Sequence, residues 1–67
     1  MLEKEFEEWK NLVNESVAFY ANKINQLNEM LKDEKLDHIE RQIIESEMTS
    51  ALDEKKKWEQ AQSELER

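Results

Sequence analysis

Apolar residues recur at steps of three and four along the first half of the chain. Nine of them form one series: Leu2, Phe6, Trp9, Val13, Val17, Tyr20, Ile24, Leu27 and Leu31. On a helix, which turns by about 100° per residue, all nine fall on one narrow face. The pattern predicts a helix over about residues 2–32, with an apolar stripe that another element must cover.

Three further apolar residues lie on one flank of this stripe. Leu12, Phe19 and Met30 sit about 100° from its centre, all on the same side. A single covering helix would hardly reach all three. Because phenylalanine is costly to leave in water, the flank predicts a second contact surface. Scattered apolar residues on a solvated face are the competing interpretation.

The helical period stops between residues 32 and 37. Asp37 and Glu40 have the spacing of a capping box, in which each side chain accepts a hydrogen bond from the other residue's backbone N–H. Lys32 and Lys35 suit the C-terminal end of a preceding helix. These signals predict a bend at about 33–37 and a second helix over about 38–66. The alternative is one continuous helix in a coiled coil, because no glycine marks a stop.

The second helix carries a weaker apolar stripe. Its best row is a heptad series of Ile44, Ala51, Trp58 and Leu65. If the chain folds back at the bend, the numbers of facing positions sum to about 71. The facing pairs are then Phe6 with Leu65, Val13 with Trp58, Tyr20 with Ala51, and Leu27 with Ile44. A large residue opposite a small one at Tyr20 and Ala51 supports an antiparallel hairpin.

Two carboxylates interrupt the second stripe. Glu47 and Glu54 fall near the centre of its face, where burial without a partner would cost several kcal/mol. They are expected either to reach solvent at the edge of a bundle or to form, with Tyr20, a polar layer that sets the register. The first helix therefore has more apolar surface than the second can cover. We expect an all-α, antiparallel two-helix hairpin that dimerises into a four-helix bundle.

Length and composition limit the class of protein. Sixty-seven residues make a single domain, 1–67, and a chain of this size buries only about 60% of its unfolded surface. Cysteine, glycine and proline are absent, which excludes disulfides and thiolate metal sites and disfavours a sheet with tight turns. Charged residues make up 40% of the chain while the apolar residues keep a helical period, which favours long helices over disorder. Helix packing or oligomerisation must then supply the stability.

Charge and hydropathy indicate the partners and the location. The net charge of −7 is spread over both halves, so neither nucleic acid nor an anionic membrane is an expected partner. The only basic cluster, residues 55–57, is flanked by acids and is expected to form a salt-bridged, solvated face. No apolar run approaches the roughly 18 residues of a membrane span, and residues 1–8 lack the basic start of a signal peptide. We expect a cytoplasmic protein.

The sequence offers little for catalysis or metal binding. His38 is the only histidine, and Glu34, four residues before it, is its candidate partner for a cation. A solvated His38 in the first turn of the second helix is the favoured interpretation. Two helices form no pocket in which a nucleophile or base would be held by an orienting group. We expect no enzyme activity, no cofactor and no metal site.

The expected function is protein binding. We expect a small, acidic, non-enzymatic module, such as an adaptor, co-chaperone or regulator, that binds a partner through the apolar face of the first helix. The expected contact residues are Trp9, Leu12, Val13, Phe19, Tyr20, Met30 and Trp58. The alternative is an acidic inhibitor, of a phage or mobile-element type, that occupies a basic nucleic-acid-binding site on a target protein. A third hypothesis is a structural fragment of a longer coiled coil.

The predicted hairpin resembles two kinds of small helical protein in length and helix layout. These are the plasmid regulators of the Rop type and the hairpin co-chaperones of type III secretion needle proteins. The resemblance covers layout alone and involves no shared motif. It therefore assigns no residue a role, and the acidic surface departs from the RNA-binding face of Rop.

Overall fold

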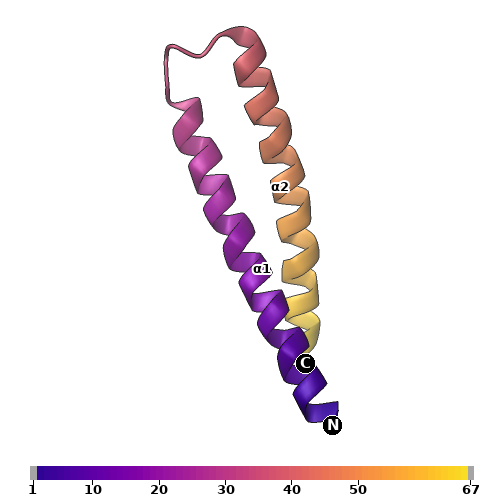
Figure 1. Ribbon diagram of the computed structural model, residues 1–67. Coiled ribbons are helices and arrows are strands. Elements are labelled where there is room, and N and C mark those ends of the chain that lie inside the picture. Colours follow the sequence, from indigo (N-terminus) through magenta and orange to yellow (C-terminus); the bar gives the residue numbers. More distant parts are fainter. Residues whose placement is uncertain (1, 67) are drawn as a thin grey trace.

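The computed structural model describes residues 2–66, which form two long helices joined by a short linker. Helix α1 spans Leu2–Leu31 and helix α2 spans His38–Leu65. The helices run antiparallel, so that α1 begins at the end of the hairpin where α2 stops (Figure 1). The predicted all-α helical hairpin is therefore confirmed, and the alternative of one continuous helix is wrong. Dimerisation into a bundle stays a prediction.

The linker, residues 32–37, ends α1 without a glycine. The amides of Lys32 and Asp33 donate to carbonyls three residues earlier, each at 3.2 Å, which tightens the last turn. The guanidinium of Arg41, on α2, donates to the carbonyl oxygen of Leu31 at 3.1 Å and to that of Asp33 at 3.4 Å. An arginine can satisfy the last carbonyls of a helix in this way. The C-terminal end of α1 is therefore stabilised partly by a residue of α2.

The predicted capping box begins α2. The backbone N–H of Glu40 donates to Oδ1 of Asp37 at 2.7 Å, and the backbone N–H of Asp37 donates to Oε1 of Glu40 at 3.3 Å. Asp37 has extended backbone angles (φ −78°, ψ 173°), as expected for a residue that precedes the first helical turn. The two bonds satisfy amide groups that have no partner inside the helix.

Asp37→Ala is expected to lower the free energy of unfolding by about 1 kcal/mol, because an amide of the first turn loses its acceptor. Glu34→Ala, in the same linker, is the control, because the Glu34 side chain makes no hydrogen bond among the described residues. Thermal melts followed by far-UV circular dichroism measure the difference. Equal melting temperatures for the two variants would contradict a stabilising role for the cap.

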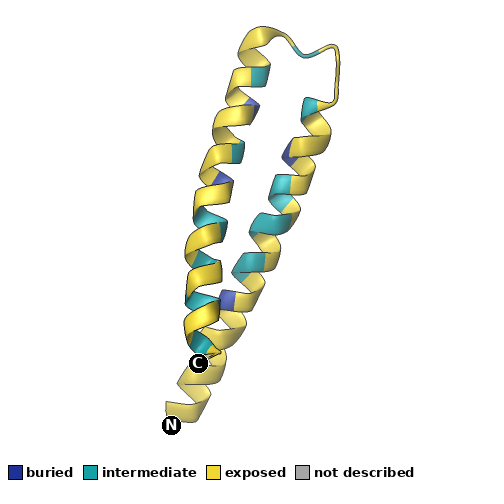
Figure 2. Cartoon of the chain, turned by 180° about the vertical axis from the view of Figure 1, so that it is seen from behind, coloured by how far each residue is buried: buried dark blue, intermediate teal, exposed yellow. Residues whose placement is uncertain are grey.

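The core is a thin row of side chains between the helices. The buried residues are Val13, Leu27, Ile44 and Ala51. Leu27, Ile44 and Ala51 form one cluster, and the half-buried side chains packed against it are Tyr20, Ile24, Leu31, Leu36 and Met48. Figure 2 shows the buried and half-buried positions facing inward along both helices. The cluster combines the facing pairs expected from the sequence, Tyr20 with Ala51 and Leu27 with Ile44.

The hairpin is a rod that is longer on the α1 side. It measures 53 by 15 by 14 Å between Cα atoms. In Figure 1, α1 continues past the last turn of α2, so its first turn has no neighbour. Within residues 2–66 neither helix combines the length and the apolar content needed to cross a membrane.

Candidate protein-interaction surface

Large apolar side chains are more often exposed than buried in this hairpin. Among residues 2–66, nine are between 44% and 77% exposed: Leu2, Phe6, Trp9, Leu12, Phe19, Met30, Ile39, Ile43 and Leu52. Six of these nine lie on α1. Isolated apolar residues on a surface are ordinary, whereas groups of them mark sites where other molecules bind. The positions of the nine residues therefore decide whether they form sites.

One group lies at the open end of the hairpin. Leu2 and Phe6 are exposed because α2 stops at Leu65, which lies level with Phe6 along the hairpin, and Trp9, one turn further along α1, is 45% exposed. The rings of Trp9 and the half-buried Trp58 lie 5.9 Å apart between centroids, inclined by 48°. A shallow hollow follows α1 beside Leu2 and Phe6, between Glu3 and Glu7. We call Leu2, Phe6, Trp9 and Trp58 the open-end patch.

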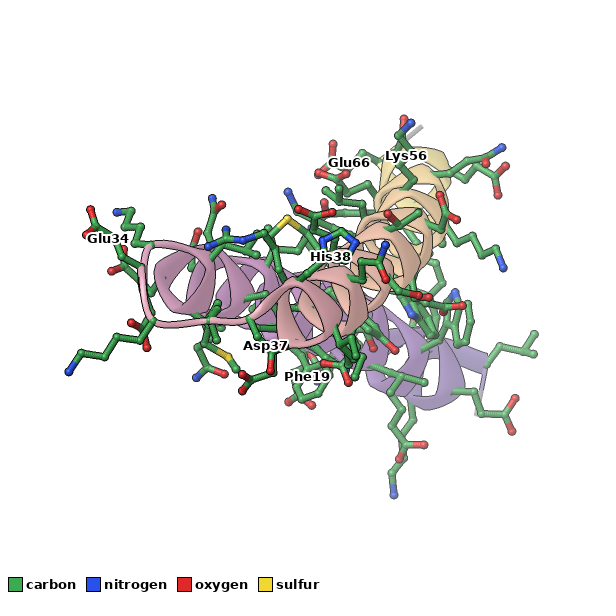
Figure 3. All side chains as sticks on the ribbon, turned by 90° about the horizontal axis from the view of Figure 1, so that it is seen from above. Phe19, Glu34, Asp37, His38, Lys56 and Glu66 are labelled. Atoms are coloured by element: carbon green, nitrogen blue, oxygen red, sulfur yellow. The ribbon has the colours of Figure 1, made fainter. Side chains whose placement is uncertain are left out.

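A second group lies along the side of α1. Leu12, Phe19 and Met30 are each about half exposed, and Phe19 is the most open of them at 59%. One edge of Phe19 rests on Tyr20 in a T-shaped contact, with 5.1 Å between ring centroids and an interplanar angle of 86°. Figure 3 shows Phe19 on the outside of the hairpin, on the side away from Lys56. The outer side of this ring lines a shallow hollow with Asn22, Lys23 and Gln26.

Exposed residues of α2 project to the same side as Phe19. Positions advance clockwise when a right-handed helix is viewed from its N-terminus, and anticlockwise when it is viewed from its C-terminus. Seen from the start of α1, Phe19 points roughly 100° anticlockwise from the core direction set by Val13 and Leu27. Ile43, which precedes the buried Ile44, points roughly 90° clockwise from the core direction of α2. Because the two core directions oppose each other, Phe19 and Ile43 project to one side.

Observed contacts agree with this construction. By helix geometry Trp9 and Trp58 both point slightly toward the side of Phe19, and their rings are in contact. The same geometry places Asn14 on the opposite side, where its Oδ1 accepts a hydrogen bond of 2.8 Å from Nε2 of Gln62. The side that carries Phe19 combines apolar residues from both helices. We call this set the flank face: Leu12, Phe19 and Met30 of α1 with Ile39 and Ile43 of α2.

The structure separates the expected contact residues into four groups. Trp9 joins the open-end patch, while Leu12, Phe19 and Met30 join the flank face. Tyr20 and Trp58 are half-buried and present only part of their rings. Val13 corrects the sequence prediction: it is 0% exposed, because α2 covers it completely. A partner cannot contact Val13 while the hairpin is closed.

Sequence reasoning missed four residues of these surfaces. The apolar series of the first helix contains Leu2 and Phe6, and the register sum of about 71 places Leu2 beyond Leu65, but the expected contact residues include neither. Ile39 and Ile43 lie outside the heptad row that defines the second stripe, and both are exposed. The signal that identifies Ile43 is its position next to Ile44, because two adjacent residues of a helix cannot both point into a narrow core.

The charged residues form solvated edges. Glu47 is exposed, and Oε1 of Glu54 lies 3.6 Å from Nζ of Lys57. Nζ of Lys55 lies 3.7 Å from Oε2 of Glu59. Surface pairs of this kind contribute about 0–1 kcal/mol each. In the hairpin the two interrupting carboxylates therefore lie at the edge, as one of the two sequence-based interpretations expects.

The described residues contain no grouping of ligands for a metal ion. Among residues 2–66, no three histidine, aspartate or glutamate side chains are placed to hold one. Figure 3 shows Glu34 and His38 well apart at the linker end, so these two side chains do not share a cation in this conformation.

The fold and its surface define a small two-helix hairpin with two exposed apolar regions. Comparison of the chain with models of protein families, with curated proteins and with solved structures finds no significant match. The geometry of the hairpin is therefore the basis for the function proposed below.

Proposed function

We propose that the protein is a small, acidic, non-enzymatic interaction module of the cytoplasm, which binds other protein chains through the exposed apolar residues of α1. The observation that supports this proposal best is the placement of six exposed large hydrophobic residues on one helix. Adaptors, co-chaperones and regulators use such helical surfaces to hold partner helices.

The open-end patch has the composition of a binding anchor. Covering a side chain such as Phe6 or Trp9 contributes about 1.5–3 kcal/mol when it is fully removed from water. Tryptophan is enriched among the few residues that dominate binding energy in protein interfaces. Trp9 is held by its contact with Trp58, so little side-chain entropy is lost when a partner covers it. Trp9 is therefore the residue on which partner binding should depend most.

Trp9→Ala is expected to abolish the capture of partner proteins from a lysate of the native host, because the anchor is removed. Leu52→Ala is the matched control, since Leu52 is 44% exposed, close to the 45% of Trp9, and lies on the other side of the hairpin. Quantitative mass spectrometry compares the proteins retained by wild type and by each variant. Far-UV circular dichroism verifies that both variants keep their helices. Proteins retained equally by Trp9→Ala and wild type would contradict the proposal.

The acidic surface supports a second candidate function. The net charge of −7 would allow the hairpin to occupy a basic nucleic-acid-binding site on another protein. The two functions differ in their response to salt. Binding through the open-end patch is expected to change little as salt is raised from about 0.1 to 1 M, whereas binding through charge should weaken steeply. The dissociation constant of a captured partner, measured across this range, distinguishes them.

A further inference from the structure

We infer that a second copy of this chain covers the flank face, with α1 of each copy packed on α2 of the other. This inference rests on the proposed function, because the second copy is the partner of one of the two exposed apolar surfaces. The two-fold axis runs parallel to the helices, between two hairpins stacked through their flank faces. Every helix in the resulting four-helix bundle then has antiparallel neighbours. Leu2, Phe6 and Trp9 of the open-end patch are left for a different protein.

The side of the hairpin that carries the flank face is large enough for a stable dimer. This whole side, which includes the first turns of α1, measures 53 by 15 Å between Cα atoms, a projected area of about 800 Å². Protein–protein interfaces of standard size bury about 800 Å² on each partner. A hairpin with only four buried hydrophobic residues among residues 2–66 also has little core of its own. A second copy supplies the missing apolar contacts without requiring any other chain.

The two-fold arrangement brings matching side chains together. Rotation about an axis parallel to the helices leaves each residue at the same level along that axis in both copies. A residue of α1 therefore lies level with the α2 residue, in either copy, whose number adds to its own to give about 71. The apposed residues are Leu12 with Trp58 and Ala61, Phe19 between Ser50 and Glu54, and Met30 with Ile39 and Ile43 of the second copy. Large side chains therefore face small ones or fill the space between two others, as interdigitating layers require.

The charges of the flank face favour this arrangement over its main rival. Lys23, which is half-buried beside Phe19, lies at the same level along the helix axes as Glu47 of the second copy. Within one hairpin Lys23 forms no ion pair among residues 2–66, so it is available to that carboxylate. The rival dimer stacks α2 on α2 and brings Glu47 and Glu54 of both copies into one interface, because both residues lie on the flank side of α2. Two acidic chains would then bring like charges together in their interface, which is unfavourable.

The solution mass tests the dimer. Sedimentation equilibrium is expected to give twice the chain mass of 8.1 kDa for the wild type. Phe19→Glu is expected to halve the mass, because it places a charge in the centre of the flank face. Leu52→Glu, on the opposite side, should leave the dimer intact. Far-UV circular dichroism verifies that each variant is helical. A wild type that is monomeric at every concentration, or equal effects of the two variants, would overturn the inference.

A charge exchange between two separate variants tests how the helices are paired. Lys23→Glu alone and Glu47→Lys alone each place like charges together twice in a dimer of identical copies, and both are expected to shift toward monomer. Mixing the two variants in equal amounts restores an opposite-charge pair at both positions of a mixed dimer. The dimer mass should therefore return on mixing. Two variants that stay monomeric when mixed, beside a dimeric wild type, would overturn the pairing of α1 with α2.

The outcomes also separate this inference from the proposed function. A monomeric wild type that still captures partners in a Trp9-dependent manner would overturn the dimer and leave the proposed function standing. A dimer that captures no partner through Trp9 would overturn the proposed use of the open-end patch and leave the dimer standing.

Discussion

Leu27→Ala is expected to lower the free energy of unfolding by about 2–5 kcal/mol. Leu27 is buried in the single cluster that it forms with Ile44 and Ala51, so the substitution removes apolar contacts and leaves a cavity. A chain of 67 residues has about 3–10 kcal/mol of stability in total. A large fraction of the variant should therefore be unfolded in conditions where the wild type is folded.

Urea titrations followed by far-UV circular dichroism measure this loss. All proteins are compared at one concentration, because association would add to the apparent stability. Leu52→Ala provides the control, since it removes the same number of atoms from an exposed position and should cost less than about 1 kcal/mol. Equal losses at positions 27 and 52 would show that the helices do not pack through Leu27.

Ala51→Glu is expected to prevent the hairpin from closing at neutral pH. Ala51 is 2% exposed and packs in the core cluster with Tyr20. A longer, charged side chain overfills this position and has no cation among the residues of the cluster. Overpacking costs about 1–3 kcal/mol and an unpaired buried charge several kcal/mol more. The total approaches or exceeds the whole stability expected for the chain.

The pH dependence of this variant identifies the buried charge as the cause. Burial raises the pKa of the introduced carboxyl in the folded state above its unfolded value of about 4.3. The folded state then binds more protons than the unfolded state, so the deficit in stability shrinks as the pH falls from 7 toward about 4. Ser46→Glu, at an exposed position of α2, is the control and should lack this relief. A deficit of constant size from pH 7 to 4 would show that the introduced carboxyl is solvated.

The helices and their register could be predicted because their signals are local or periodic. The capping box of Asp37 and Glu40 lies within four residues and is present as predicted. The heptad row through Ile44 and Ala51 predicts a register that the core cluster reproduces. These features depend on helix geometry alone, which the spacing of residues determines.

The end of α1 and the extent of its exposed apolar surface could not be predicted, because both depend on contacts between the two helices. The carbonyl oxygen of Leu31, at the end of α1, accepts a hydrogen bond from Arg41, ten residues later, and no local sequence pattern predicts that bond. Val13 and Trp9 belong to the same stripe, yet α2 covers the first completely and the second only in part. The stripe indicates which face is apolar. How much of it α2 covers depends on the length and placement of that second helix.

The most direct test of the central claim, that the exposed apolar residues of α1 contact other chains, is photo-crosslinking in cells of the native host. A photoreactive phenylalanine analogue replaces Trp9, Phe19 or, as a control, Leu52, and mass spectrometry identifies the crosslinked chains. The analogue at position 9 should crosslink to a different protein. At position 19 it should crosslink to α2 of a second copy, and at position 52 it should give little product. Equal crosslinking at all three positions, or none at positions 9 and 19, would contradict the claim.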